Sequence, residues 1–205
     1  VKNRIKMEII DRPIYTESIK KWMGKGLVIV LTGQRRVGKS MCLKLIEKQE
    51  SCKPGCNIIH IDKEDHMFQD IKNDTDLNGY LENKFIDGKR NLILIDEVQD
   101  IVDFEHSVRS WIKRPNTDII LTGSNAMMLS SDLSTKLAAR YKEIPIHGLN
   151  YLEFLAFHNL EDSDSSLEKY LTYGGLPFLK VLGLEDKQQI TDYVKSVYDT
   201  VVLKD

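Results

Sequence analysis

The chain has 205 residues, a net charge of −2 and a pI near 6.3, with 41% hydrophobic and 29% charged residues. This length allows one sizeable domain or a domain with a small appendage, and the composition is ordinary for a globular protein. The slightly acidic balance argues against a chain that mainly coats nucleic acid, which would need a broad basic surface.

The first predicted strand is the apolar run LVIVLT at 27–32, and it leads into the loop GQRRVGKS at 33–40. This loop matches the phosphate-binding pattern G-x-x-x-x-G-K-[ST], in the required position between a strand and a helix. Glycines let consecutive backbone N–H groups turn toward phosphate oxygens, and the helix N-terminus adds partial positive charge. We therefore expect this segment to bind a nucleoside phosphate, through Gly33, Gln34, Arg35, Arg36, Val37, Gly38, Lys39, Ser40 and Met41.

Two side chains of the loop have a distinct chemistry. Lys39 can reach the β- and γ-phosphates of a bound nucleotide, and the hydroxyl of Ser40 can ligate Mg²⁺. The structural alternative is a glycine-rich turn with a surface lysine. The strand before the loop and the helix after it favour the nucleotide-binding interpretation.

The next segment predicts a helix, KSMCLKLIEKQE at 39–50, and a second strand, NIIHI at 57–61. The intervening CKPGC is one residue too long for a C-x-x-C redox pair, and no zinc-type ligand pair follows it. We expect its cysteines to be reduced, as in a cytosolic protein. No apolar run approaches the roughly 20 residues that span a bilayer, and the charged first ten residues do not resemble a signal peptide. These features predict a cytoplasmic chain with no membrane contact.

The third predicted strand, NLILI at 91–95, follows a helical pattern at 76–86 and carries Asp96 and Glu97 at its C-terminal end. Ligands of open α/β sheets bind at that end of the strands. Asp96 would hold Mg²⁺, directly or through water, and Glu97 would orient or activate the attacking water. Either carboxylate alone could instead cap the next helix.

The last two predicted strands are DIILT at 118–122 and YKEIPIH at 141–147. The polar residue that follows the first of them would lie near the γ-phosphate, and the strand does not choose between Ser124 and Asn125. A glycine-containing turn with Asn125 as a helix cap is the alternative. Arg140 precedes the second strand and could reach a γ-phosphate across a subunit contact of a homo-oligomer. A solvated arginine at a helix end is the alternative for Arg140.

These strands alternate with helical patterns and are near-continuous apolar runs, which favours a parallel sheet covered on both faces. The fold class is therefore α/β, a doubly wound five-stranded sheet of the P-loop NTPase type. Residues 149–205 show apolar spacings of three and four and no strand candidates. We expect an ATPase core at 1–148 and a helical, lid-like subdomain at 149–205, with a further C-terminal portion beyond it.

Several segments together resemble the bacterial and archaeal predicted ATPases of the AAA+ superfamily. These are GQRRVGKS, LILIDEVQ, LTGSNAMMLSSDLSTKLAARYKEIPI, YLEF and YLTYGGLPFL, which cover nearly the whole chain. The resemblance implies ATP with Mg²⁺, a five-stranded parallel core and a helical lid. Members of the family carry a C-terminal domain of unknown function after this core.

The resemblance also implies roles for particular residues. Ser124 or Asn125 would be the polar sensor of the γ-phosphate, and Arg12 and Tyr15 would lie near the adenine. GGLP at 174–177 resembles a Gly-x-Pro element through which Pro177 would contact nucleotide from the lid, although a plain interhelical turn is equally consistent. The family's usual glycine before the arginine is Ala139 here, so the turn that presents Arg140 can differ.

The leading functional hypothesis is Mg²⁺-dependent ATP hydrolysis that drives a conformational switch, acting on an unknown protein partner. One alternative is a nucleotide-binding regulatory module with little or no intrinsic hydrolysis. Another is a DNA-associated ATPase, for which the basic stretches KKWMGK at 20–25 and RSWIKR at 109–114 are the evidence. Such stretches are usually solvated helix faces, so we do not expect nucleic acid to bind through this part of a protein.

Overall fold

The computed structural model describes residues 10–123, 136–137 and 140–202. The chain divides into two compact units. We call Pro13–Gly33 together with Lys39–Ile146 the sheet unit, and Arg12, Gln34–Gly38 and the chain from His147 onward the helical unit. The expected boundary between residues 148 and 149 stays a prediction.

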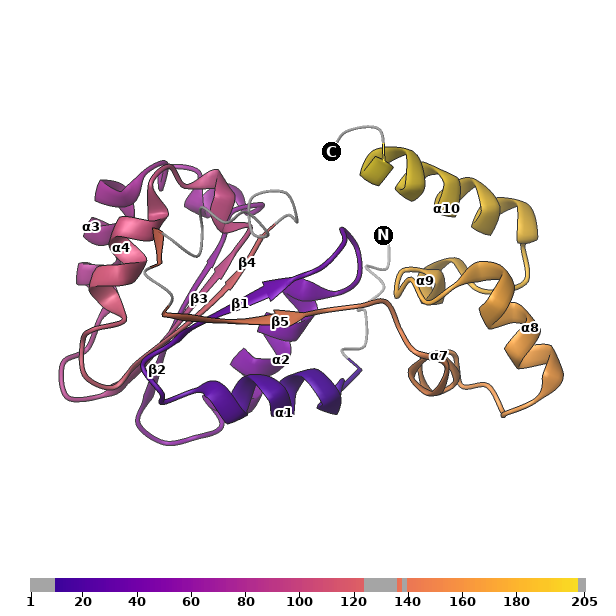
Figure 1. Cartoon of the computed structure of the whole chain (residues 1–205), viewed down its shortest axis with the longest axis horizontal. Helices are drawn as coiled ribbons and strands as arrows, with labels where there is room; N and C mark the ends of the chain where they lie inside the picture. Colours follow the sequence, from indigo (N-terminus) through magenta and orange to yellow (C-terminus); the bar gives the residue numbers. More distant parts are fainter. Residues whose placement is uncertain (1–9, 124–135, 138–139, 203–205) are drawn as a thin grey trace, which may run out of the picture. The chain divides into compact units, whose positions relative to one another are not determined.

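The sheet unit is built on five parallel strands in the order β2-β3-β4-β1-β5 (Figure 1). Their bounds are Val28–Thr32 for β1, Cys56–Asp62 for β2, Arg90–Asp96 for β3, Thr117–Thr122 for β4 and Tyr141–Pro145 for β5. This sheet confirms the predicted α/β fold class. The order places β4 between β1 and β3, so the segments that follow these three strands emerge side by side at one edge of the sheet.

Four α-helices and two short 3-10 helices complete the described part of the sheet unit: α1 Pro13–Trp22, α2 Lys39–Ser51, η1 His66–Phe68, α3 Asp74–Lys84, η2 Val98–Asp100 and α4 Phe104–Trp111. One face of the sheet packs against α3 and α4 in a core that includes Val30, Ile93, Leu81 and Trp111. The other face packs against α2, and α1 packs against α2 and β5 (Figure 1). Every residue of β1 and β4 is buried, as expected for strands covered on both faces.

The helical unit contains α7 Tyr151–His158, α8 Asp164–Tyr173, α9 Leu179–Leu182 and α10 Lys187–Val202. Asn150 begins α7 with a capping box, in which its side chain accepts from the backbone of Glu153 while Glu153 accepts from the backbone of Asn150. A small core joins these helices, built from Leu149, Phe154, Leu179, Leu184 and Ile190. Among the described residues, no helix combines the length and apolar character needed to cross a membrane.

Candidate nucleotide-binding site

The loop after β1 turns sharply, through backbone angles that favour glycine. Gly33, Arg36 and Gly38 all have positive φ, at 137°, 67° and 102°. At Gly33 this conformation coincides with a close approach, because an added Cβ would lie 2.1 Å from the backbone oxygen of Ile146. Only glycine fits there, which explains why the loop begins with this residue.

Lys39 and Ser40 open α2 immediately after this loop. The side chain of Lys39 is only 5% exposed, and its Nζ donates a hydrogen bond to the carbonyl oxygen of Gly33 at 2.9 Å. The ammonium group is therefore folded back over the start of the loop, where phosphate oxygens could replace the carbonyl as its acceptor. Ser40 is partly buried in the first turn of the helix, where backbone N–H groups lack helical partners.

The two predicted carboxylates lie at the C-terminal end of β3. Asp96 is 2% exposed, and the hydroxyl of Thr122, at the end of β4, donates to its Oδ1. The same hydroxyl oxygen accepts the backbone N–H of Glu97 at 3.1 Å. Thr122 thus bridges both residues of the Asp-Glu pair. The sequence interpretation assigned no role to Thr122, because the position of β4 beside β3 appears only in the fold.

Glu97 has an unusual backbone. Its φ of 53° and ψ of 52° lie in the left-handed region, which non-glycine residues seldom adopt. Its side chain accepts a hydrogen bond from the amide of Gln99, with 2.5 Å between Nε2 and Oε2. Strained backbone of this kind is found most often at functional sites. The sequence interpretation assigned no role to Gln99.

Negative charge gathers at this edge of the sheet. The pKa of Glu64, which follows β2, is raised first by burial and then by the charges of Glu97, Asp62 and Asp96. An anionic phosphate would be repelled here unless a cation neutralised the carboxylates. This charge favours binding of nucleotide together with a divalent cation.

The donor set at this edge fits Mg²⁺, which prefers hard oxygen ligands and is usually held by one or two protein oxygens together with phosphates. The hydroxyl of Ser40 and the carboxylate of Asp96 are such oxygens. No cluster of three or more His, Cys, Asp or Glu side chains in the described ranges could hold a metal by itself.

The middle of the loop, Gln34–Gly38, belongs to the helical unit, where Arg12 holds it. The guanidinium group of Arg12 donates to both carboxylate oxygens of Glu153 at 2.8 and 2.9 Å and to the carbonyl oxygen of Val37 at 3.1 Å. It also donates to the backbone oxygens of His147 and Gly148. Arg12 is 5% exposed. The pKa of Glu153 is below its ordinary value: burial raises it, but the hydrogen bonds from Arg12 and from the backbone of Asn150 lower it by more. Arg12 thus holds the loop in place through its hydrogen bond to Val37. Its contact with adenine stays a prediction.

Two further residues of the helical unit lie against the same loop. A Cβ placed on Gly38 would be 4.0 Å from Cγ of Pro177. The guanidinium carbon of Arg36 lies 5.4 Å from the ring centre of Tyr193 in α10. The predicted residue Pro177 is therefore next to the phosphate loop, whereas Tyr193 was not recognised in the sequence.

The remaining predicted residues lie elsewhere. Ser124 and Asn125 fall outside the described residues. Arg140 is exposed at the start of β5, where its backbone oxygen accepts the N–H of Val28 at the start of β1. The phosphate loop follows the opposite end of β1. Arg140 is thus at the far edge of the sheet from the loop of its own chain.

Comparison with known proteins places these features in a family. Residues 25–155 match the family model described as AAA domain. The chain is 30% identical over 204 residues to an uncharacterized protein of Haemophilus influenzae, covering 96% of this chain and 50% of that protein. An uncharacterized protein of Methanocaldococcus jannaschii is 26% identical over 207 residues, with 94% of this chain and 44% of that protein covered. The chain thus spans about half the length of these relatives.

Solved structures share the fold at low identity. Cdc6p from Pyrobaculum aerophilum superposes with a TM-score of 0.56 at 11% identity, over 95% of this chain and 64% of that one. AMPPCP-bound DnaA from Aquifex aeolicus has a TM-score of 0.55 at 16% identity, over 88% and 65%. The fold, the phosphate loop and the family match agree, and the chain belongs to the AAA domain family of the AAA+ superfamily.

Proposed function

We propose that this chain binds ATP with Mg²⁺ and hydrolyses it. The observation that carries the proposal is the arrangement around Thr122, whose hydroxyl joins Asp96 and the backbone of Glu97 at the sheet edge where the phosphate loop also begins. A water-activating carboxylate, a metal-binding carboxylate and a phosphate-binding lysine at one edge of a sheet are the groups that ATP hydrolysis requires.

In this reaction the oxygen of a water molecule bonds to the γ-phosphorus while the bond from that phosphorus to the β–γ bridging oxygen breaks. The electron pair of the broken bond leaves with ADP, and Glu97 accepts the proton of the water. Lys39 stabilises the negative charge of the transferring group, having exchanged the Gly33 carbonyl for phosphate oxygens. Backbone N–H groups of the loop hold the phosphates in line with the water.

The hydroxyl of Ser40 and the carboxylate of Asp96 would hold Mg²⁺, which when bound offsets the charge of the phosphates. The hydroxyl of Thr122 donates to Oδ1 of Asp96, so Oδ2 is the carboxylate oxygen that would bind the cation. The hydrogen bond from Thr122 keeps the carboxylate in one orientation, as partners of metal ligands commonly do.

The proposal includes a conformational switch. The oxygen of Val37 is bonded to Arg12, Gly38 lies beside Pro177 and Arg36 lies beside Tyr193. Nucleotide bound to this loop would therefore act directly on parts of the helical unit. The relatives are about twice as long as this chain. We therefore expect a protein partner that responds to the conformational change to bind regions outside this chain. We expect the ATPase to act in the cytoplasm.

Arg140 would serve the site of a neighbouring copy. It lies at the opposite end of β1 from the phosphate loop, so it has no route to the nucleotide of its own chain. A homo-oligomer could present this exposed arginine to the γ-phosphate held by the next subunit. Without such a contact the chain would be a regulatory module with slow hydrolysis.

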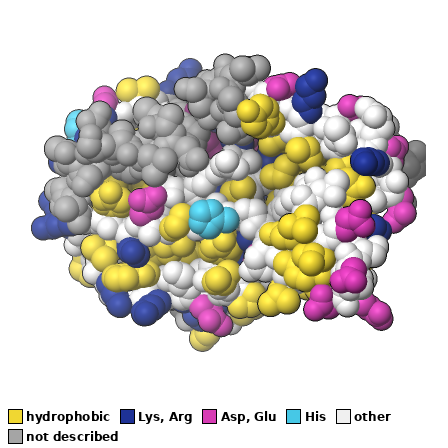
Figure 2. Space-filling view, turned by 45° about the vertical axis from the view of Figure 1, so that its right-hand side comes forward, with side chains coloured by type: hydrophobic (Ala, Val, Ile, Leu, Met, Phe, Trp, Pro, Cys, Tyr) yellow, Lys and Arg dark blue, Asp and Glu magenta, His cyan; other side chains and the backbone are white. Residues whose placement is uncertain are grey.

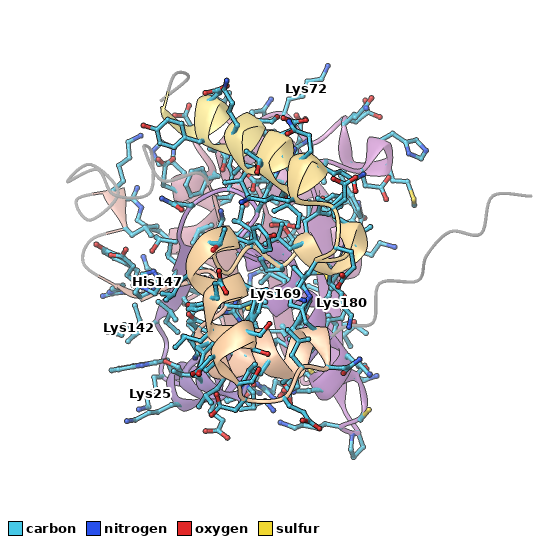
Figure 3. The ribbon with its side chains drawn as sticks, turned by 90° about the vertical axis from the view of Figure 1, so that its right-hand side faces the viewer. Lys25, Lys72, Lys142, His147, Lys169 and Lys180 are labelled. Carbon is cyan, nitrogen blue, oxygen red and sulfur yellow. The ribbon has the colours of Figure 1, made fainter. Side chains whose placement is uncertain are left out.

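The described surface gives little support to a DNA-associated role. Lys25 and Lys142, labelled in Figure 3, lie 4.7 and 5.2 Å from the ring centre of Trp22, so this aromatic ring is already covered by side chains of the chain itself. On the described part of the face shown in Figure 2, basic side chains are interspersed with acidic and hydrophobic ones. A strand of nucleic acid would need a more continuous basic track.

The test measures ATP binding and ATP turnover with Mg²⁺ for the wild type, Glu97→Gln and Lys39→Ala. Glu97→Gln should bind ATP like the wild type and lose turnover by at least about 100-fold, because the amide accepts no proton. Lys39→Ala should lose binding by about 100-fold, since its buried ammonium is the main cation of the loop.

Matched controls lie on the same elements. Asp100→Asn changes an exposed carboxylate of η2, and Lys44→Ala removes an exposed lysine of α2. Both should behave like the wild type. Turnover that survives in Glu97→Gln would refute the assignment of Glu97, and unchanged affinity in Lys39→Ala would refute the phosphate-loop site.

A further inference from the structure

Gln99 stands out among residues to which neither the family match nor the reaction chemistry assigns a role. Its side-chain amide donates to Oε2 of Glu97 at 2.5 Å, and both side chains are partly buried. A hydrogen bond between side chains two residues apart in the sequence can form at a surface without any functional role. Three features of its surroundings indicate a function instead.

The first feature is the rigidity of the turn that carries Gln99. η2 is closed by the N–H of Asp100 to the oxygen of Glu97 at 3.1 Å and by the N–H of Ile101 to the oxygen of Val98 at 3.0 Å. Val98 and Ile101 are 0% and 1% exposed and belong to the main core of the sheet unit. Gln99 therefore lies between two buried residues, which fix the position of its backbone and so limit where its side-chain amide can reach.

The second feature is that both the backbone and the side-chain carboxylate of Glu97 are restrained by hydrogen bonds. Its N–H is bound to Thr122, its backbone is left-handed, and its carboxylate is bound to Gln99. Left-handed backbone at a residue with a Cβ costs about 1 kcal/mol or more, and it persists where the surroundings determine it. The bonds from two neighbours thus fix where the carboxylate points.

The third feature is the chemistry of the donor. An amide donates a hydrogen bond without bringing a charge, so it orients the carboxylate and leaves it negative and able to accept a proton. An arginine or lysine at this place would form an ion pair and oppose protonation. Methionine would fill the same space without donating, and a carboxylate would repel Glu97.

We propose that Gln99 is a positioning residue for water activation: its amide holds Oε2 of Glu97, so that Oε1 is presented to the attacking water. The inference rests on the proposed ATPase function. A carboxylate free to rotate would spend much of its time in orientations that cannot take the proton, and misplacement of about 1 Å can cost a factor of about 100 in rate.

The experiment compares kcat and KM for ATP, together with the dissociation constant for ATP and the melting temperature, in the wild type, Gln99→Met and Gln99→Glu. Gln99→Met should lower kcat by about 10-fold to 100-fold while the dissociation constant changes by less than about twofold. Gln99→Glu should lower kcat at least as much, because it keeps the shape and loses the donor.

The matched control is Gln188→Met in α10. The amide of Gln188 also donates to a nearby carboxylate, Oδ1 of Asp192 at 2.9 Å, but on an exposed helix face. This variant should leave kcat unchanged. A fall in kcat for Gln99→Met at constant ATP affinity and constant melting temperature supports positioning.

Two outcomes would overturn the inference and are distinguishable from failure of the ATPase proposal. If the wild type turns over ATP and Gln99→Met turns it over equally fast, Gln99 has no positioning role. If kcat, affinity and melting temperature of Gln99→Met all fall together, its role is only structural. If the wild type itself shows no turnover, the ATPase proposal fails, and the role of Gln99 fails with it.

Discussion

The edge of the sheet and the middle of the phosphate loop are held in different ways. At the sheet edge the hydrogen bonds join the chemical groups to one another, as Thr122 joins Asp96 to Glu97 and Gln99 restrains Glu97. In the loop, the hydrogen bonds join the backbone oxygen of Val37 to Arg12, which is itself bonded to Glu153 of the helical unit.

This difference separates two tasks. Residues that fix the carboxylates should govern the rate of hydrolysis, because they set geometry that matters only when water attacks. Residues that fix the loop should govern nucleotide affinity and stability, because they hold the shape of the phosphate cradle whether or not reaction follows. Substitutions in the two regions should therefore move different measured quantities.

Replacing Arg12 should have the largest effect on stability. Arg12→Met removes a buried guanidinium whose bonds reach Glu153, Val37, His147 and Gly148, and it leaves the carboxylate of Glu153 without its cation. We expect a loss of about 2–3 kcal/mol in the free energy of unfolding, since the pair is mostly buried. ATP affinity should fall by about tenfold, whereas kcat at saturating ATP should stay within about twofold.

The control for Arg12 is an exposed ion pair of the helical unit. Lys169→Met breaks the contact with Glu185, whose side chain is 93% exposed, and it should change stability by less than about 0.5 kcal/mol. Denaturant unfolding and calorimetric titration with ATP measure the two effects. If Arg12→Met reduced kcat as strongly as it reduced ATP affinity, the proposed separation between residues that govern rate and residues that govern affinity would be wrong.

Replacing Thr122 should have an intermediate effect and act on the rate. Thr122→Val keeps the shape of the side chain but leaves Oδ1 of Asp96 and the N–H of Glu97 without their shared partner. We expect kcat to fall by about tenfold with ATP affinity nearly constant, and Thr122→Ser, which keeps the hydroxyl, to restore most of the rate. Steady-state turnover and nucleotide titration check this expectation.

Ser107→Ala separates the loss of a buried hydroxyl from the loss of this particular one. Ser107 is fully buried in α4 and donates to the backbone oxygen of Asp74, away from the carboxylates. Its replacement should cost stability and leave kcat unchanged. An equal fall in kcat for Ser107→Ala and Thr122→Val would show that the rate follows general stability, and not the bridge at the sheet edge.

The sheet was predictable because its strands are short continuous runs of Ile, Leu and Val, a pattern typical of strands buried on both faces. The helix α1 was not predicted. It buries only Thr16 and Ile19, and although Tyr15, Ile19 and Trp22 lie at helical spacing, the sequence interpretation did not use this short pattern.

The candidate site could be proposed from the sequence where its residues form one continuous motif, as in the loop and in Asp96 and Glu97, and the nucleotide contacts of these residues stay predictions. Thr122 was not recognised, because the sequence does not give the order of the strands, and this order alone brings β4 beside β3. The pairing of Arg12 with Glu153 was hidden for a similar reason, since 141 residues separate them along the chain. Motifs report local geometry, and contacts between distant segments depend on the whole fold.

The smallest predicted effect concerns pH and is confined to the helical unit. Burial, with the charge of Lys180 as a second cause, lowers the pKa of His158 to about 4, and its buried Nε2 has no hydrogen-bond partner in the part of the chain that the structure describes. Because this pKa lies below the ordinary value of 6.5, the unfolded chain binds the proton more readily, and stability falls as pH drops from about 6.5 toward 4. Between pH 7 and pH 6 the loss should be about 0.7 kcal/mol. His158→Phe, which keeps an aromatic ring beside Phe154, should remove this loss. Equal pH slopes of unfolding in the two proteins would contradict the lowered pKa, because they would mean that His158 binds a proton as readily in the folded chain as in the unfolded chain.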